Sequence, residues 1–207
     1  MKTNATLIVI VLFSAAAIII IRQNSPTNDV RSKADLIESY IPSPSPVPKD
    51  ENETASQTSS DGKLQLTLKT HSTAGTKTYS YVVAPTTDSS NNLAILTDTV
   101  DGDTVYTIPY NTFSTDNKYL FVEKSVKGMK HVLIFKTSGE PFAGREQSID
   151  VRALFSAYTS DYAFSEVTGW ASETLLIIRS VKADSTSGPS YWLNVSTRSF
   201  TRLSNRF

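Results

Sequence analysis

The feature that most constrains the fold of this chain is a short turn motif that occurs twice. Ser59 to Leu64 reads SSDGKL, and a matching segment, Ser114 to Tyr119, reads STDNKY. In each copy, polar turn residues lead directly into an apolar run. The two copies are 55 residues apart. A repeat of this kind indicates that one supersecondary unit is used more than once and that the units stack to bury their apolar faces. We therefore expect a β-rich domain built from repeated sheets.

Short apolar or alternating runs between turn residues predict the strands. The segment Lys63 to Lys69, KLQLTLK, has leucine at every second position, which is typical of a half-buried strand. The dipeptide Asp101-Gly102 lies between two runs and predicts a hairpin, because it suits a type I′ turn. A further pair is joined through Lys127-Gly128. The predicted strands are Lys63–Lys69, Lys77–Ala84, Leu93–Val100, Thr104–Tyr110, Tyr119–Lys124, His131–Lys136, Leu175–Ser180, Tyr191–Val195 and Phe200–Leu203.

One helix is predicted from Asp150 to Tyr158, with Asp150 as its N-cap. Val151, Leu154, Phe155 and Tyr158 recur at the spacing of one helical face. The helix precedes a third, weaker unit of the repeat.

That third unit begins at Gly169-Trp170-Ala171-Ser172 and lacks the Asp-Gly/Asn-Lys element of the other two turns. At these residues the chain resembles the WD40-like, TolB-type β-propeller repeat family, whose blades carry an aromatic residue, a Ser-Pro-Asp-Gly-Lys turn, an apolar strand and a strand ending in a Thr-Gly-Glu-like turn. The best match is Phe113 to Phe121 followed by Ile134 to Glu140. Thr115 stands where the family favours proline, and Asn117 where it favours glycine.

The resemblance covers Asp61 to Leu203 as about three units, whereas closed propellers have about four or more blades. Three arrangements therefore remain: a partial propeller of blade-like sheets, a β-sandwich whose hairpins mimic blades, and a subunit that closes by association. The expected fold class is a mostly β antiparallel meander of blade-like hairpins with one short helix, behind an N-terminal transmembrane helix. The resemblance implies binding by loops at one end of the scaffold, without chemistry of its own.

The predicted transmembrane helix is the uncharged run Ala5 to Ile21. As a helix it extends roughly 25 Å, at the short end of what crosses a hydrocarbon core of about 30 Å. A buried core helix is disfavoured because the run is apolar on nearly every face. A cleavable signal peptide is the main alternative, but bulky isoleucines at Ile18 to Ile21 occupy the place where a peptidase prefers small residues. We therefore expect residues 1–22 to be an uncleaved signal anchor.

The orientation of this anchor is decided by two opposing signals. Arg22, Arg31 and Lys33 follow the run and favour a cytoplasmic C-terminus by the positive-inside rule. The very short N-terminal tail with its own charge at Lys2 favours the opposite, and we expect the C-terminal domain outside the cytoplasm.

Residues 23–60 are expected to be a disordered Pro/Ser-rich spacer, since they are poor in aromatic residues and rich in Ser, Thr, Asn and Pro. A short helix is predicted within it at residues 29–40. Ile41 to Pro48 has proline at every second position, which favours polyproline II. The remaining residues 61–207 are expected to form one β-rich globular domain.

Composition argues against several classes of function. The 20 basic residues balance the 20 acidic ones, so no global charge favours nucleic acid. Cysteine is absent, which removes thiolate metal sites and cysteine nucleophiles. Of the two histidines, neither His71 nor His131 has convergent catalytic partners in the sequence, and the acidic cluster Asp98, Asp101 and Asp103 lacks the flanks of a calcium loop. We expect no catalytic residue, no metal and no cofactor.

Aromatic side chains are the remaining candidates for a site. Trp170, Tyr191 and Trp192 are the predicted ligand or partner contacts, because exposed rings stack on sugars or peptides. The alternative is that most of the aromatic residues lie in a core, as strand periodicity favours. Tyr191 and Trp192 are neighbours on one strand and must point to opposite faces. The expected function is a single-pass, membrane-anchored, extracytoplasmic binding or protein-interaction module that is not an enzyme, with a protein or glycan partner and with oligomerisation open. The alternatives are an assembly subunit of a cell-envelope complex and, third, a hydrolase.

Overall fold

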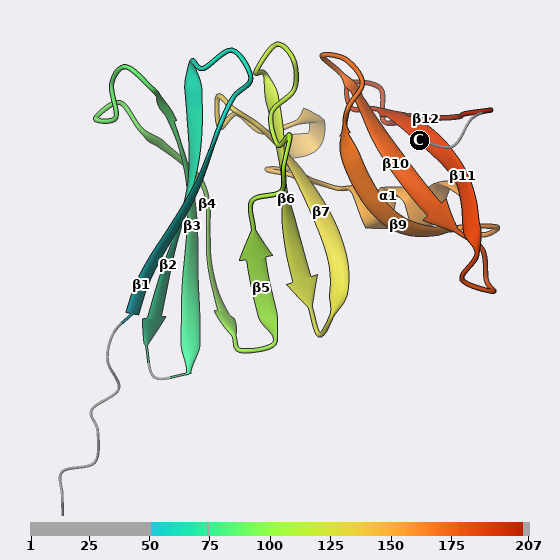
Figure 1. Cartoon of the computed structure of the whole chain (residues 1–207), viewed down its shortest axis with the longest axis horizontal. Coiled ribbons are helices and arrows are strands. Elements are labelled where there is room, and N and C mark those ends of the chain that lie inside the picture. The colour runs from blue at the N-terminus through green and yellow to red at the C-terminus, as the bar shows by residue number, and fades with distance from the viewer. Residues whose placement is uncertain (1–50, 74, 205–207) are drawn as a thin grey trace, which may run out of the picture. The chain divides into compact units, whose positions relative to one another are not determined.

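The computed structural model describes residues 51–73 and 75–204 (Figure 1). The chain divides into two units, residues 1–44 and 45–207, and all described residues belong to the second. The described residues are mostly β and form three antiparallel four-stranded sheets and one α-helix, α1 (Val151–Tyr158). The run Ala5 to Ile21, the helix predicted at 29–40 and the proline-rich stretch lie outside the described residues. None of the described helices is long and apolar enough to span a membrane.

Each sheet is a meander of consecutive strands (Figure 1). In the first sheet the order is β1-β2-β3-β4, in the second β5-β6-β7-β8, and in the third β9-β10-β11-β12. The strands are β1 (Glu51–Thr58), β2 (Leu64–Thr73), β3 (Thr76–Pro85), β4 (Leu93–Asp101), β5 (Thr104–Thr107), β6 (Tyr119–Val126), β7 (Met129–Lys136), β8 (Ile149–Asp150), β9 (Ala163–Trp170), β10 (Leu175–Val181), β11 (Ser187–Asn194) and β12 (Ser199–Arg202), and a 3-10 helix lies at Ala143–Arg145.

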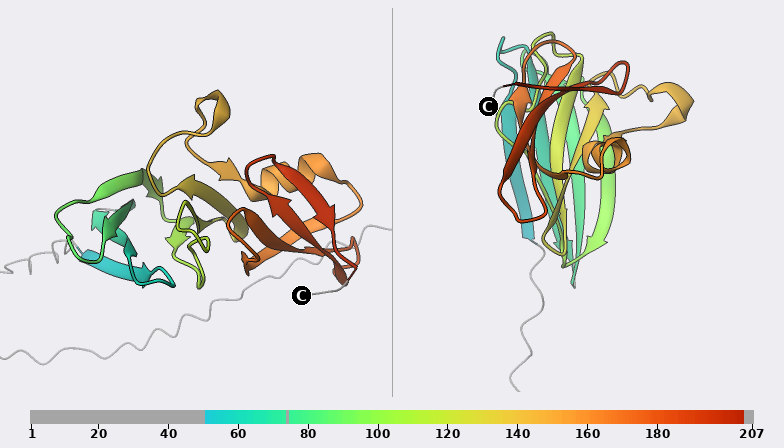
Figure 2. Two further views of the ribbon diagram at one scale, coloured as in Figure 1. Left: turned by 90° about the horizontal axis from the view of Figure 1, so that it is seen from above. Right: turned by 90° about the vertical axis from the view of Figure 1, so that its right-hand side faces the viewer.

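The second sheet is buried on both faces. Leu120 and Val122 of β6 belong to a core cluster with residues of the first sheet, such as Leu66. Their neighbour Phe121 belongs to a different cluster, with residues of the third sheet such as Leu176. Because successive side chains of a strand point to opposite faces, the second sheet is the middle layer of the three (Figure 2).

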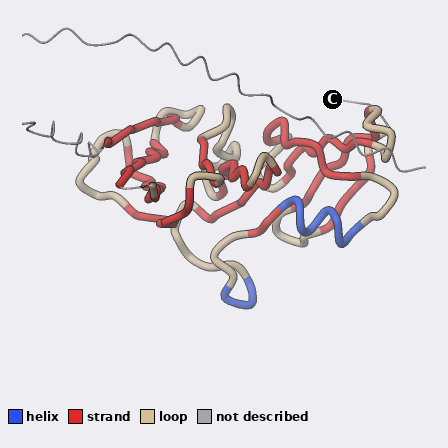
Figure 3. Tube along the Cα trace, turned by 90° about the horizontal axis from the view of Figure 1, so that it is seen from below, coloured by secondary structure: helices blue, strands red, loops and turns tan. Residues whose placement is uncertain are grey.

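Helix α1 completes the second of these clusters. It packs on β7 and β9 (Figure 3). The Asp150 carboxylate accepts a hydrogen bond from the Ala153 N–H at 3.1 Å, and Val151 and Phe155 are fully buried. The predicted helix and its cap are therefore confirmed.

The nine predicted strands are all present, as β2 to β7 and β10 to β12. The hairpin through Lys127-Gly128 is confirmed as well, since both residues have positive φ angles, 50° and 79°, and join the paired strands β6 and β7. Three of the twelve strands were not predicted: β1, the two-residue strand β8, and β9, whose pairing with β10 is irregular.

The hairpin predicted at Asp101-Gly102 is wrong. β4 pairs with β3, and β5 pairs with β6, so this dipeptide connects the first sheet to the second. Gly102 does not have the positive φ angle that a type I′ turn requires. Pairing with β3 places Ile95 of β4 in the core beside Tyr81, and a local turn signal cannot outweigh that burial.

The predicted spacer, residues 23–60, extends too far. Its last part forms β1, which pairs with β2 over eight consecutive residues. Every described side chain from Asn52 to Ser56 is exposed. This strand is held by main-chain hydrogen bonds to β2 more than by burial, which is why composition alone placed it in a disordered segment.

The turn motif forms the same hydrogen-bond pattern in both copies. In the first, the Ser59 hydroxyl donates to Asp61 Oδ1 at 2.8 Å, the Lys63 N–H donates to the same oxygen at 3.1 Å, and the Leu64 N–H donates to Ser59 Oγ at 3.0 Å. Gly62 has a φ angle of 73°, which explains why glycine occupies this position.

In the second copy the equivalent bonds join Ser114 to Asp116 at 2.9 Å, Lys118 to Asp116 at 3.2 Å and Tyr119 to Ser114 at 3.0 Å. Asn117 stands in place of glycine with a φ angle of 60°, and asparagine tolerates this conformation. Its side-chain amide donates to Asp61 Oδ1 at 2.8 Å, which ties the two turns together.

The third turn keeps only the main-chain part of this pattern. The Ala171 N–H donates to the Leu175 carbonyl at 2.7 Å, which is the counterpart of the bond from Ser59 to the carbonyl of Leu64 at 2.8 Å. The third turn is one residue shorter and has no aspartate at its centre. The three sheets therefore begin their second strand with related turns, two of them equivalent in side-chain bonding.

Candidate binding groove

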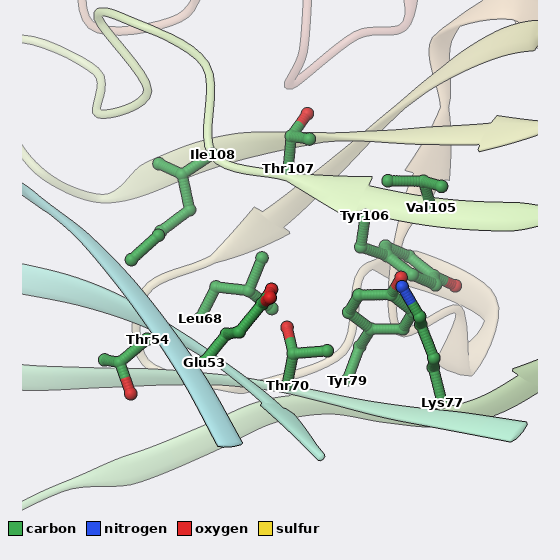
Figure 4. Close-up of a pocket in the computed structure, with 11 residues that line it drawn as sticks. Glu53, Thr54, Leu68, Thr70, Lys77, Tyr79, Val105, Tyr106, Thr107 and Ile108 are labelled. Carbon is green, nitrogen blue, oxygen red and sulfur yellow. The ribbon is translucent and has the colours of Figure 1, made fainter. Parts of the chain in front are cut away.

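A groove with a volume of about 720 Å³ lies between β1 and β5, above the face that β2 and β3 turn toward the second sheet (Figure 4). It has a floor of apolar and aromatic residues and exposed polar residues at its sides. The lining residues are Glu53, Thr54, Ala55, Leu68, Thr70, Lys77, Tyr79, Val105, Tyr106, Thr107 and Ile108.

Two tyrosines form the closed part of the groove. The rings of Tyr79 and Tyr106 are tilted by 53° with their centroids 5.1 Å apart, and each residue is only 3% exposed. The Tyr79 hydroxyl reaches the carbonyl of Thr104 at 3.4 Å, and the neighbouring Tyr81 hydroxyl donates to the carbonyl of Thr107 at 2.9 Å. β3 thus holds β5 in place by two tyrosine hydroxyls, which fixes one wall of the groove.

Two charged residues that do not line the groove, Asp98 and Lys124, hold the Tyr106 side chain. Its hydroxyl donates to Asp98 Oδ2 at 2.6 Å, and Lys124 Nζ donates to the same oxygen at 3.2 Å. The Lys124 ammonium also lies 5.0 Å from the centroid of the Tyr106 ring, within the range of a cation–π interaction. This network keeps the ring in one orientation.

The pKa values in this network fit that role. The hydrogen bond from Tyr106 lowers the pKa of Asp98 below its ordinary value. Burial, together with the bond to Asp98, raises the pKa of Tyr106 above its ordinary value. Around neutral pH the carboxylate is therefore ionised and the phenol is neutral, so the bond between them has a fixed donor and a fixed acceptor.

Glu53 and Lys77 supply opposite charges to the groove (Figure 4). Glu53 is exposed on β1, and Lys77 is half-buried on β3. Thr70 adds a buried hydroxyl on the floor. This set of groups can bind a ligand by stacking, apolar contact and hydrogen bonds. No cluster of metal-binding side chains occurs among the described residues.

The structure does not bring the three predicted contact residues together, and none of them lines the groove. Trp170 is half-buried, stacks on Tyr119 at 6.2 Å and donates its indole N–H to the carbonyl of Thr112 at 3.1 Å. Tyr191 is 3% exposed in the core cluster between the second and third sheets. Trp192 is half-buried on the other face of β11, as the alternation of side chains requires.

The sequence contained part of the signal for the groove. Tyr79 lies in KTYSYVVA, a segment that the sequence predicts to be a strand, and Tyr79 and Tyr81 share one face because they are two residues apart. Tyr106 and Glu53 had no such signal, because their places depend on the pairing of β5 with β6 and of β1 with β2.

Each histidine has a polar partner. His71 lies between Asn52, at 2.8 Å from Nδ1, and Thr73, at 2.9 Å from Nε2, with all three side chains exposed. His131 Nδ1 lies 2.8 Å from Asp150, the residue that caps α1. Neither histidine lines the groove. The first group stands on an open sheet surface and the second serves a helix end, so neither arrangement resembles a catalytic cleft.

Comparisons with known proteins add little. No family model matches the chain, and the comparison with curated proteins found no match. Among solved structures, the AtxE2 isopeptidase, in its S527A variant with Astexin3-dC4 bound, aligns with a TM-score of 0.49 at 12% sequence identity. The alignment covers 75% of this chain and 30% of that one, so the chain spans about a third or less of the isopeptidase's length.

Proposed function

We propose that this chain is a membrane-anchored, extracytoplasmic binding module without enzymatic activity, whose domain consists of three blades of an incomplete β-propeller of the WD40-like, TolB type. Two observations support the blade assignment. Each sheet is a four-stranded meander, and the turns before β2 and β6 have equivalent side-chain hydrogen bonds. A β-sandwich with crossover connections between its sheets would not require each sheet to be a meander of consecutive strands with an equivalent turn.

The observation that carries the binding role is the groove between β1 and β5. Ligand sites are typically concave, mostly apolar and equipped with a few placed polar groups. The groove has this character, with Leu68 and Tyr79 on its floor and Glu53 and Lys77 at its sides. The wall formed by β5 is held in place because the Tyr106 hydroxyl donates to Asp98.

Site-specific photocrosslinking in the native host tests this function. A photoreactive amino acid at Glu53 samples the groove, since this side chain is exposed and points into it (Figure 4). The same substitution at Glu173, an exposed residue of the third turn, is the matched control. We expect an adduct from position 53 that is absent from position 173 and is lost on Lys77→Ala. Identical adducts from both positions would contradict a groove-specific ligand.

A second function, assembly into an envelope complex, is favoured by the outer face of the third sheet. Leu175, Ile177 and Trp192 are half-buried there, while the alternating residues Leu176 and Ile178 lie in the core. Ile177 and Trp192 are directly opposite each other in the pairing of β10 and β11. Sedimentation of the full-length chain in detergent tests this alternative, and the proposal expects Trp192→Ser to dissociate an oligomer that the unmodified chain forms.

The anchoring part of the proposal rests on the run Ala5 to Ile21. Protease treatment of intact cells that carry a C-terminal tag checks the orientation. We expect the tag to be removed from intact cells, and its protection until lysis would place the domain in the cytoplasm.

A further inference from the structure

The groove is bounded by the edges of two strands and not by their faces. β1 contributes the consecutive residues 53–55, and β5 contributes the consecutive residues 105–107, followed by Ile108 just beyond the strand. By contrast, β2 and β3 contribute alternate residues, Leu68 with Thr70 and Lys77 with Tyr79. Since successive side chains point to opposite faces, alternate residues mark a sheet face and an unbroken run marks an edge. The groove therefore has a sheet face as its floor and two strand edges as its walls.

Figure 4 agrees with this description. Glu53, Thr70, Tyr79 and Tyr106 point into the groove, while Thr54 lies on the other side of β1. Thr54 therefore lines the groove through its main chain.

The main-chain groups on the free edge of β1 follow from its pairing with β2. The Ser59 N–H donates to the carbonyl of Leu64 at 2.8 Å, so this pair is of the hydrogen-bonded type. Hydrogen-bonded and non-hydrogen-bonded pairs alternate in an antiparallel ladder, and the register is continuous from Thr58↔Gln65 back to Glu51↔Ser72. The N–H and C=O groups of Thr54 and its alternate neighbours therefore point away from β2.

The same reasoning applies to β5. The Lys127 N–H donates to the carbonyl of Asp103 at 2.9 Å, one step before the pair Thr104↔Val126. The main-chain groups of Thr104 and Tyr106 therefore point away from β6. The bond from the Tyr79 hydroxyl to the Thr104 carbonyl is consistent with this direction.

Both strands end their sheets, so neither of these edges pairs with another described strand. A free edge is a template for a further strand, and peptides bind other domains by adding to such edges. We propose that the groove binds an extended peptide segment of a partner protein, which pairs with the free edge of β1 at Thr54 and places alternate apolar side chains on Leu68 and Tyr79. This inference rests on the proposed binding function and names the class of its ligand.

The charges and the floor limit which peptides fit. Glu53 and Lys77 balance each other, so the groove favours a peptide without strong net charge. The floor favours apolar or aromatic side chains at every second position.

The test uses the full-length chain in mild detergent and a display library of random nine-residue peptides as the probe. The affinities of peptides selected on the unmodified chain are then measured for two variants that each place a proline on the free edge of β1. Thr54→Pro removes the N–H in the groove, whereas Thr58→Pro removes one outside it, so the second is the matched control. Both side chains are exposed, and proline is tolerated on an edge strand, so both variants are expected to fold, which circular dichroism checks.

We expect the selected peptides to bind Thr54→Pro at least tenfold more weakly and Thr58→Pro within twofold of the unmodified chain. The peptide amides fall into two alternating sets that point to opposite edges of the bound strand. N-methylation of the set that faces β1 is expected to abolish binding, whereas N-methylation of the other set is expected to leave it intact. Equal binding to both proline variants, or equal loss for both N-methylated sets, overturns strand addition while leaving the groove as a binding site. If no peptide is enriched, the groove does not bind peptides and this inference is wrong. The proposed binding function would be contradicted as well only if the photocrosslinking experiment also gave no adduct from position 53.

Discussion

The first and third sheets both bury one face against the second sheet, but their outer faces differ. The first sheet carries hydroxyl pairs across its strands, Thr78 with Thr99 at 2.9 Å and Ser80 with Thr97 at 3.1 Å. The third sheet presents Leu175, Ile177 and Trp192 on its outer face. A polar outer face is what a terminal repeat needs in contact with water. The stack therefore has one end suited to solvent and another suited to a neighbour.

The turns before the second strand of each sheet also set the third sheet apart from the first. The first and second sheets share the full aspartate-centred bonding pattern, and Asn117 links their turns through Asp61. The third turn retains only its main-chain bond. The third sheet relies instead on helix α1, whose Phe155 packs on Tyr191 and Phe200 with ring centroids 5.1 and 5.4 Å apart. Related sheets are thus stabilised by polar turns at one end and by an aromatic core at the other.

The largest expected effect comes from removing the aromatic core of the third sheet. Phe155→Ala is expected to lower the free energy of unfolding by about 3–5 kcal/mol, because the side chain is fully buried and its cavity cannot fill easily. Urea unfolding followed by tryptophan fluorescence measures it. The exposed neighbour Ser156→Ala is the control. An effect below that of a surface substitution would show that α1 does not stabilise the third sheet.

A smaller effect is expected from the aspartate of the second turn. Asp116→Ala removes acceptors for the Ser114 hydroxyl and the Lys118 N–H and is expected to cost about 1–2 kcal/mol. Glu173→Ala, in the third turn, is expected to have almost no effect. Chemical denaturation of both variants compares the turns, and equal losses would contradict the difference between them.

The pH dependence of stability is expected to follow two other aspartates, Asp61 of the first turn and Asp98 behind the groove. Hydrogen bonds from Asn117 and Lys63 hold the pKa of Asp61 below its ordinary value, and the bond from Tyr106 does the same for Asp98. A lowered folded-state pKa contributes stability above the unfolded value of about 3.9 that is lost as the pH falls through the folded value. Thermal unfolding between pH 6 and pH 2 is expected to show this loss, and to show less of it for Asp61→Asn. An unchanged pH profile in that variant would contradict the role of the turn.

The smallest expected effect concerns the polar outer face of the first sheet. Thr99→Ala breaks one exposed hydroxyl pair and is expected to cost roughly 0.2–1 kcal/mol, the usual range for a cross-strand pair. Thermal denaturation measures the loss of stability of this variant, and Thr201→Ala, which replaces an exposed threonine of the third sheet, is the control. A cost well above this range would mean that the outer face is covered by something that makes it part of a core.

Several parts of the fold were predictable because their signals are local. The alternation in Lys63 to Lys69 predicts a sheet with one buried face, and β2 has that environment. The cap at Asp150 and the turn at Lys127-Gly128 also depend only on nearby residues.

Other parts depended on pairings between distant residues. β1 has few apolar side chains, so only its ladder with β2 reveals it. The Asp101-Gly102 dipeptide resembles a hairpin turn, yet it connects two sheets because β4 has a better partner in β3. The groove was missed for the same reason, since its walls are the free edges that remain after β1 and β5 have paired.

The sequence by itself determined the repeated turns, nine of the twelve strands and the helix, because each follows from hydrogen bonds and side-chain periodicity within a few residues. Only the tertiary structure decided which strands pair, which sheet lies in the middle and which edges remain open. Those outcomes depend on the burial of apolar surface contributed by residues far apart in the chain, such as Leu66 with Leu120 and Phe121 with Leu176.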